Sequence, residues 1–243
     1  MKLDSARVFV TGADGGIGRQ LSEQLLDRGV SHLYEGIYGL GTVNRHGRTT
    51  QVALDVTDFQ SVTSAASLAQ DLDLVINCAG IFTGPSQLDV EGTVKRLQRE
   101  IDVNALGILR MTRAFGPGLA RRSGRVVNMV SVTAWVGSTQ YLTYAASKAA
   151  AWSLTNSLRL EWATRGVGVT GVFAGFVDTP LASGIDAPKS SPADIASVIL
   201  DGIEADENEI LCDDRTRNVK RNLSEDQELI YAPMLAGAEK SAG

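Results

Sequence analysis

Short runs of β-branched and apolar residues alternate with longer helical patterns along almost the whole chain. This alternation is typical of βαβ units, in which helices connect parallel strands and cover both faces of a sheet. The sequence therefore predicts an α/β fold with a doubly wound, mainly parallel sheet of about seven strands flanked by helices. The expected strands comprise residues 7–10, 32–38, 50–56, 72–78, 124–131, 166–175 and 208–212.

The expected helices have recognisable ends. Asp58 stands where an aspartate caps the first turn of a helix, and Ser191 precedes a proline at the start of another. A long helical pattern covers residues 90–120. Gly107 and Gly116–Pro117 are expected to weaken or end parts of it, because glycine and proline disfavour helix interiors.

The length of 243 residues permits one large α/β domain or two small ones. No internal repeat, low-complexity tract or linker-like stretch interrupts the series of strands and helices. A single domain over residues 1–236 is therefore favoured. The small, polar residues 237–243 are expected to fray.

Composition excludes several classes of function. A net charge of −5 gives no basic surface for nucleic acid or an anionic membrane. No apolar signal segment and no unbroken apolar run of 18 residues are present, so a cytoplasmic location is expected. Cys78 and Cys212 are far apart and form no metal-ligand spacing. We therefore expect no metal site and a reducing compartment.

A glycine-rich turn, TGADGGIG, follows the first expected strand directly. Gly12, Gly16 and Gly18 let backbone N–H groups approach an anionic pyrophosphate, and a helix N-terminus adds favourable dipole charge. The simpler interpretation is a tight strand-to-helix turn. Its place at the start of a βαβ series favours dinucleotide binding.

Two tyrosines and a lysine stand close together in the stretch QYLTYAASKAAA. Tyr144 and Lys148 are four residues apart, so on a helix both side chains project from one face. Tyrosine has a pKa of about 10 and is a poor base at neutral pH, but a nearby ammonium stabilises its phenolate. Lys148 is therefore expected to lower the pKa of Tyr144. Tyr141 can share the same face one turn farther away and is a second candidate base.

The G-x-x-x-G-x-G turn, the NCAG segment at 77–80 and the Tyr144-x-x-x-Lys148 pair together resemble the short-chain dehydrogenase/reductase family. The resemblance extends from Val8 to about Cys212. It implies a Rossmann-type fold and NAD(P)-dependent hydride transfer between nicotinamide and a carbonyl or secondary alcohol.

The resemblance also implies a catalytic tetrad of Asn104, Ser131, Tyr144 and Lys148. Ser131 would orient the substrate oxygen, Tyr144 would exchange its proton, and Lys148 would bind the nicotinamide ribose. Asn104 would help to hold a water-linked proton relay to the lysine. Tyr141 lies only ten residues after Ser131 and is interpreted as a wall of the substrate pocket. Each residue alone also has a structural interpretation, such as a strand end or a solvated helix charge.

The resemblance likewise implies a set of cofactor contacts, with Val177 and Thr179 at the nicotinamide carboxamide. Two departures from the family pattern are tolerable: Ala174 replaces a proline, and Cys78 replaces the second asparagine of N-N-A-G. The implied cofactor-binding residues are Gly12, Asp14, Gly16, Ile17, Gly18, Tyr38, Asp55, Val56, Asn77, Ala79, Gly80, Tyr144, Lys148, Val177 and Thr179.

The choice between NAD and NADP depends on the end of the second strand. A carboxylate there binds the ribose diol of NAD, and an arginine binds the 2′-phosphate of NADP. This chain has Tyr38 there and neither charge. Arg45, His46 and Arg48 could fold back onto a 2′-phosphate, and this gives a slight preference for NADP. A solvated loop is the other interpretation of these three residues.

Aromatic and apolar residues follow several of the expected strands and predict a pocket for a small hydrophobic carbonyl or alcohol. The same residues could also be core. Family members are often homodimers or homotetramers. Two other functions remain open, namely an isomerising or non-redox reaction on the same fold and a non-catalytic dinucleotide sensor. The predicted pocket residues are Phe82, Trp135, Tyr141, Phe176 and Leu181.

Overall fold

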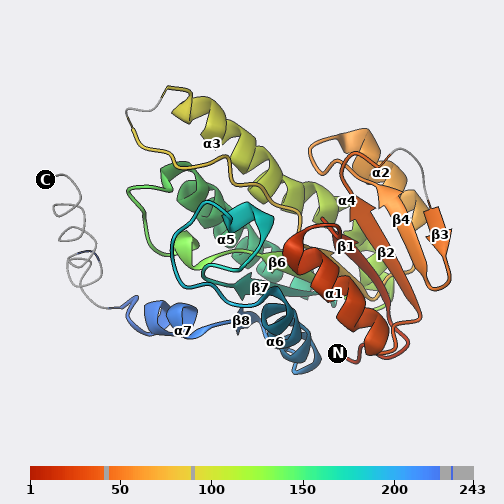
Figure 1. The fold of residues 1–243 in the computed structure, drawn as a ribbon. Coiled ribbons are helices and arrows are strands. Elements are labelled where there is room, and N and C mark those ends of the chain that lie inside the picture. Colours follow the sequence, from red (N-terminus) through yellow and green to blue (C-terminus); the bar gives the residue numbers. More distant parts are fainter. Residues whose placement is uncertain (41–43, 89–90, 225–230, 232–243) are drawn as a thin grey trace, which may run out of the picture.

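The computed structural model describes residues 1–40, 44–88, 91–224 and 231, which form one eight-stranded sheet with helices on both faces (Figure 1). The strands follow the order β3-β4-β2-β1-β5-β6-β7-β8. They are β1 (Arg7–Thr11), β2 (His32–Ile37), β3 (Asn44–His46), β4 (Thr49–Ala53), β5 (Leu74–Asn77), β6 (Arg125–Met129), β7 (Gly168–Phe173) and β8 (Glu209–Leu211).

The order in which strands are added to the sheet reverses at β1. This strand pairs in parallel with β2 on one side and with β5 on the other. In doubly wound sheets, ligands bind at such a point, beyond the carboxyl ends of the strands. Every strand pair except β3–β4 is parallel, so the predicted doubly wound sheet is confirmed. The antiparallel strand β3 was not expected.

Helices cover the two faces of the sheet unequally. α1 and α6 pack on one face, and α2, α4 and α5 pack on the other. The helices are α1 (Gly16–Asp27), α2 (Phe59–Leu68), α3 (Thr93–Ile101), α4 (Gly107–Arg121), α5 (Leu142–Ala163), α6 (Pro192–Glu204) and α7 (Asp214–Arg221). Short π-helical and 3-10 turns lie at Asp102–Leu106, Val132–Ala134 and Pro180–Ala182.

The caps predicted from the sequence are present. The Asp58 side chain accepts a hydrogen bond from the Gln60 amide at the start of α2, and the Ser191 hydroxyl accepts one from the Ala193 amide at the start of α6. Both caps satisfy amides that lack a partner within the helix. The expected frayed tail, residues 237–243, lies outside the described residues.

The long helical pattern is one continuous rod formed by α3, the π-helical turn and α4. Its expected start at residue 90 lies outside the described residues. The expectation that Gly116–Pro117 ends part of it is wrong, because Pro117 lies inside α4. Gly116 is required by packing, since a Cβ atom there would lie 2.2 Å from the Trp162 ring. Tertiary contact with α5 therefore outweighs the local helix preference.

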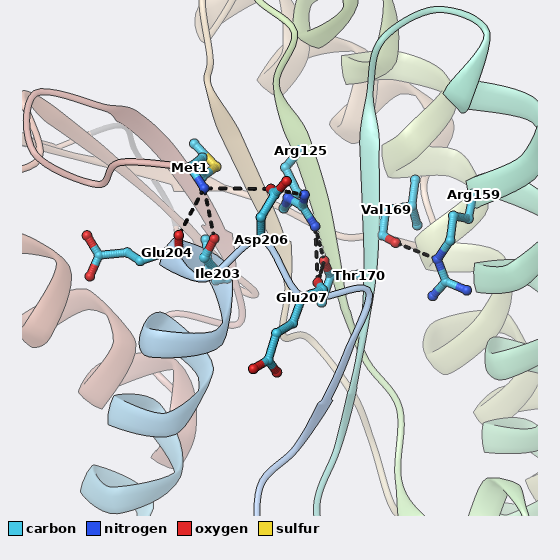
Figure 2. Close-up of polar contacts among 9 residues, drawn as sticks. All are labelled: Met1, Arg125, Arg159, Val169, Thr170, Ile203, Glu204, Asp206 and Glu207. Carbon is cyan, nitrogen blue, oxygen red and sulfur yellow. Dashed lines mark hydrogen bonds and ion pairs between the residues drawn. The ribbon is translucent and has the colours of Figure 1, made fainter.

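A buried cation closes the amino-terminal edge of the sheet (Figure 2). Arg125, the first residue of β6, is 7% exposed. Its guanidinium donates to the Asp206 carboxylate, to the Thr170 hydroxyl and, at 3.1 Å, to the Glu207 carbonyl oxygen. Buried charges of this kind require paired and hydrogen-bonded surroundings. The parallel strands begin at this edge, whereas the glycine-rich turn lies where they end.

Within the described ranges, no helix is long and apolar enough to cross a membrane. The same residues contain no group of three or more His, Cys, Asp or Glu side chains placed to hold a metal ion.

Candidate active site

The glycine-rich turn after β1 is locked against the loop after β5. A Cβ atom at Gly12, where φ is +63°, would lie 2.9 Å from the Cα of Ala79. The Ala79 amide donates a 2.9 Å hydrogen bond to the Thr11 hydroxyl. α1 then begins at Gly16, and no side chain caps its first turn. Its N-terminal amides are therefore available to an anion.

The turn also touches the segment after β7. A Cβ atom at Gly16 would lie 2.4 Å from the Cγ2 of Thr179, and one at Gly18 would lie 2.1 Å from the Gly12 carbonyl oxygen. Only glycine fits at these close approaches. Val177 is buried beside Thr179. The uncapped helix start therefore fits a pyrophosphate on the turn, and Val177 and Thr179 lie beside that turn.

Tyr144 and Lys148 project from α5 toward the same pocket, at the carboxyl ends of the strands. The Lys148 Nζ lies 5.6 Å from the centroid of the Tyr144 ring and donates a 2.9 Å hydrogen bond to the Met129 carbonyl oxygen. Lys148 is 4% exposed and makes no ion pair with any residue that the structure describes. Its charge is therefore not neutralised by a neighbouring carboxylate.

Asn104 lies in the π-helical turn between α3 and α4. Its Oδ1 accepts a 2.8 Å hydrogen bond from the Ile81 amide, and its Nδ2 donates to the Ser147 hydroxyl at 3.0 Å. A Cβ atom at Gly80 would lie 3.2 Å from the Asn104 Oδ1 and 3.8 Å from the Lys148 Nζ. Asn104 thus connects the loop after β5 to α5 beside the lysine. π-helical turns of this kind are frequent at functional sites.

Ser131 follows β6 and is 7% exposed. Its Oγ accepts hydrogen bonds from the Thr133 amide at 3.2 Å and from the Thr133 hydroxyl at 2.9 Å. These two bonds fix the serine at the start of the 3-10 turn, where it lines the same pocket as Tyr144. The Ser131 proton has no acceptor among the residues that the structure describes, so it can be donated to a ligand.

Burial shifts the ionisation of both α5 side chains. It raises the pKa of the Tyr144 phenol, and the Glu100 carboxylate raises it further. It lowers the pKa of Lys148 to about 8, with smaller opposing effects of Cys78 and Glu100. The net shift of the Tyr144 pKa is therefore upward, opposite to the direction expected from Lys148. Desolvation dominates, and Tyr144 is a neutral phenol at pH 7.

Glu100 was not identified from the sequence. This α3 residue is fully buried, and its Oε1 accepts hydrogen bonds from the Thr83 amide at 2.7 Å and the Thr83 hydroxyl at 2.8 Å. Its Oε2 has no partner among the described residues. The one available signal was the interval of four residues to Asn104, which places both on one helical face. Glu100 anchors the loop that carries Phe82.

The pocket has a volume of about 940 Å³, including the part open to solvent. Phe82, Tyr141, Phe176 and Leu181 line it, as do Ser131, Tyr144 and Lys148. Gly80, predicted as a cofactor contact, also lines it, whereas Cys78 and Arg215 line it and were not expected there. The Phe82 ring centroid lies 5.5 Å from those of both Tyr141 and Tyr144.

Trp135 is not among the residues that line this pocket, which corrects the prediction. Its ring stacks on Phe173 at 4.1 Å between centroids and packs edge-on against Trp152 at 6.5 Å. Trp135 therefore packs against a small apolar cluster that contains Val130, Ala134 and Phe173. Trp135 is close to Ser131 in sequence, but its ring packs against other apolar side chains and does not enter the pocket.

The expected adenosine end of the site is less enclosed. Tyr38 follows β2 and is 74% exposed. The Asp55 carboxylate accepts hydrogen bonds from the Thr57 amide at 2.8 Å and the Thr57 hydroxyl at 2.7 Å. Val56 is buried against Gly107. Asp55 and Val56 stand just past the end of β4.

Three other predicted cofactor contacts, Asn77, Asp14 and Ile17, lie in different surroundings. Asn77 is buried and donates a 2.8 Å hydrogen bond to Asn128, so it lies within the sheet instead of lining the pocket. Asp14 is exposed, and its carbonyl oxygen accepts a hydrogen bond from Arg19. Ile17 lines the pocket.

The cations expected near a 2′-phosphate lie elsewhere. Arg48 donates to the Val30 carbonyl oxygen at 2.8 Å and the Leu26 carbonyl oxygen at 3.2 Å, beyond the C-terminal end of α1. Arg45 and His46 belong to β3 and pair with the amino-terminal half of β4. The expectation that these side chains fold back onto the cofactor is wrong, because β3 runs toward the opposite edge of the sheet.

Comparisons with known proteins give consistent results. The family model for short chain dehydrogenase matches residues 6–190. The oxidoreductase UcpA of Salmonella typhimurium is 34% identical over 218 residues, which are 84% of this chain and 81% of that protein.

Solved structures agree. A short chain dehydrogenase from Burkholderia cenocepacia in complex with NADP superimposes with a TM-score of 0.90 at 32% identity, and the match covers 97% of this chain and 99% of that one. A second structure, from Burkholderia phymatum and in complex with NAD, has a TM-score of 0.82. At 23% identity, this second match is evidence for a shared fold and for nothing further. The match covers 94% of this chain and 96% of that chain.

Proposed function

Since the chain belongs to the short-chain dehydrogenase family and is an NAD(P)-dependent oxidoreductase acting on CH–OH or C=O groups, we propose that Tyr144 is its acid/base and that its substrate is a small apolar ketone or alcohol. One observation carries this proposal. Tyr144, Ser131 and Lys148 line the same largely apolar pocket as Ile17, in the first turn of α1 after the glycine-rich turn. Sites with few polar groups in an apolar pocket orient small substrates.

Each side chain has a separate task in this proposal. Bound nicotinamide supplies or accepts the hydride. Ser131 donates its free proton as a hydrogen bond to the substrate oxygen, and Tyr144 donates its phenolic proton to the same oxygen when a carbonyl is reduced. Burial raises the pKa of Tyr144, so the phenol is protonated at neutral pH and enters a carbonyl reduction with a proton to donate.

Lys148 and Asn104 support the proton transfer. The Lys148 ammonium, 5.6 Å from the Tyr144 ring centroid, stabilises the phenolate that forms when Tyr144 gives up its proton. By resemblance to the family, it also binds the ribose hydroxyls of the nicotinamide half. Asn104 holds the loop after β5 against α5 and helps to connect the lysine to a proton relay. These two residues therefore act on the proton, and Ser131 acts on the substrate.

For the cofactor we propose contacts from the glycine-rich turn, from the loops after β2, β4 and β5, and from Val177 and Thr179. NADP is the first candidate, because the Burkholderia cenocepacia relative holds it. Arg45, His46 and Arg48 give this preference no support. Tyr38 is exposed at the end of β2, where its ring could lie against the adenosine.

We also propose that the protein is a homodimer or homotetramer. Apolar side chains remain exposed on the long helices of one layer, including Leu109 on α4 and Leu160 on α5, the latter 78% exposed. We infer that these helices pack against a second subunit, because family members are often dimers or tetramers with the long helices at one interface. The cytoplasmic location expected from the sequence stays a prediction.

Parallel titration with NADH and NADPH tests cofactor binding and preference together. Turnover is then measured with a panel of apolar ketones for Tyr144→Phe and for the matched variant Tyr141→Phe, which also loses one hydroxyl from the pocket. We expect Tyr144→Phe to lose at least about 1,000-fold in kcat/KM and Tyr141→Phe to keep most of it. Near-normal turnover of Tyr144→Phe would refute the assignment. Loss of turnover in that variant would also exclude a non-catalytic sensor.

A further inference from the structure

A cation stands at the mouth of the pocket. Arg215, in the first turn of α7, lines the pocket together with Phe176 and Gly175. Its guanidinium carbon lies 4.8 Å from the centroid of the Phe176 ring. A Cβ atom at Gly175 would lie 3.3 Å from the Arg215 Cδ, so the arginine stem runs directly over this backbone. Stacking on an aromatic ring holds a guanidinium in one plane and leaves its N–H groups free.

The other cations of α7 have acceptors. Arg217 bonds to the Asp214 carboxylate at 3.0 Å and to the Leu211 carbonyl oxygen at 2.8 Å. Lys220 pairs with Glu209 at 2.6 Å, and Arg221 bonds to Asn218. Arg215 has no hydrogen-bond acceptor or ion-pair partner among the residues that the structure describes. It is therefore the cation of this helix that is available to a ligand.

Asp213, whose carboxylate also contacts Gly175, makes no ion pair with Arg215. Asp213 uses its Oδ2 to accept from the Gly175 amide at 2.6 Å and its Oδ1 to accept from the Thr216 amide at 2.8 Å. No aspartate or glutamate occurs among the described residues that line the pocket, whereas Lys148 and Arg215 both do. The pocket wall thus combines apolar surface with two positive charges, and this field favours an anionic ligand.

A row of aromatic rings separates the two charged ends. The Phe82 centroid lies 5.5 Å from those of Tyr144 and Tyr141, and the Tyr141 centroid lies 6.2 Å from that of Phe176, on which Arg215 stacks. A ligand with an apolar body can lie along these rings. Its carbonyl would then meet Tyr144 and Ser131, and its other end would meet the guanidinium.

We propose that Arg215 makes the pocket selective for oxo acids and hydroxy acids, by binding a carboxylate at the far end of an apolar body from the reacting carbonyl or alcohol. The proposal rests on the proposed function, because it takes Tyr144 as the reacting end. A carboxylate fits the planar fork of an arginine with two parallel hydrogen bonds.

Two pairs of probes test the proposal, one rigid and one flexible. They are 4-acetylbenzoate with its methyl ester and 7-oxooctanoate with its methyl ester, so each pair differs only in the charge at the end remote from the ketone. We expect at least one acid to have a kcat/KM about tenfold above that of its ester in the wild type. Arg215→Gln should remove this preference by lowering turnover of the acid alone, and Arg215→Lys should restore part of it.

Arg217→Gln is the matched control, because it removes the same charge two residues farther along α7, outside the residues that line the pocket. It should keep the preference for the acid. Equal preference in Arg215→Gln and the wild type, or no preference in the wild type for either pair, would overturn the proposal. So would a weaker affinity of Arg215→Gln for NADH or NADPH that accounts for its lower turnover, because Arg215 would then serve the cofactor.

Calorimetric titration separates this inference from the proposed function. If neither ketone is reduced with either cofactor, the proposed function fails, but binding of the acid and the ester is still compared. Tighter binding of an acid by the wild type and its loss in Arg215→Gln would support the carboxylate site alone. Absence of tighter acid binding in the wild type would rule the site out.

Discussion

Two buried cations stand at opposite ends of the same strand, β6. Arg125 is its first residue, and the Lys148 ammonium bonds to the carbonyl oxygen of Met129, its last residue. Arg125 is bound by the Asp206 carboxylate, the Thr170 hydroxyl and the Glu207 carbonyl oxygen (Figure 2). Within the described part of the chain, Lys148 has the Met129 carbonyl and no carboxylate.

The difference in partners indicates that the Arg125 charge has a structural role and the Lys148 charge a catalytic one. Neutralising partners make Arg125 part of the edge where β6, β7 and the segment before β8 meet. Lys148 keeps its field in the pocket, and burial without a counter-ion lowers its pKa to about 8. A buried unpaired charge destabilises the folded state, and the stored free energy is available to stabilise the Tyr144 phenolate. Lys148, at the pocket end of β6, is thus expected to serve catalysis and to lower the free energy of unfolding.

Lys148→Met gives the largest expected effect, because it removes the charge at the pocket end. We expect kcat/KM with an apolar ketone to fall by at least about 1,000-fold, since the Tyr144 phenolate loses its stabilising cation. Steady-state oxidation of NAD(P)H measures this. A fall of less than about tenfold would show that the lysine charge is not used.

Arg125→Met removes the structural cation at the first residue of β6. We expect the free energy of unfolding to fall by about 1–3 kcal/mol, because Thr170 and the Glu207 carbonyl lose a buried donor. Asp206 is 69% exposed and is rehydrated, so it adds little to the cost. Urea denaturation measures the change. Turnover per folded molecule should stay unchanged, and a loss of turnover as large as that of Lys148→Met would contradict the division of tasks.

Glu100→Gln gives the smallest effect and sharpens the account of Lys148. The Glu100 carboxylate raises the pKa of both Tyr144 and Lys148, so its neutralisation lowers both. The alkaline limb of the pH–rate profile should therefore move to lower pH. Glutamine keeps an oxygen that can accept from Thr83, which preserves the loop with Phe82. Thr83→Ala is the control, because it removes one hydrogen bond without the charge. An unchanged limb in Glu100→Gln would mean that this carboxylate acts on neither group.

The sequence predicted the parallel sheet, and the resemblance to the family predicted Ser131, Tyr144 and Lys148, which line the pocket. Alternating patterns define the strands, and the interval of four residues between Tyr144 and Lys148 fixes a shared helical face. Glycines in the turn are required by contacts with Ala79 and Thr179 that the motif only implies. The strand pattern and the shared helical face are readable because they depend on neighbours in the chain, whereas these glycine contacts join distant segments.

The failures have a common physical origin in contacts between distant segments. Trp135 is core because Phe173 and Trp152 lie beside it, and Arg48 is directed away from the cofactor because β3 pairs with β4. The raised pKa of Tyr144 depends on desolvation, which residue spacing cannot express. Arg215 reaches the pocket only because α7 packs next to the segment after β7.

The most direct test of the account is the stability of the wild type and of Lys148→Met as a function of pH. A lysine whose pKa falls from 10.5 to about 8 on folding destabilises the folded state below pH 8 by about 3 kcal/mol, and this penalty disappears as the pH rises from 8 to 10.5. Lys148→Met has no such group. Its stability relative to the wild type should therefore be greater at pH 7 than at pH 10 by about 2–3 kcal/mol. A difference that does not change between these pH values would contradict the claim that the lysine charge is buried without compensation.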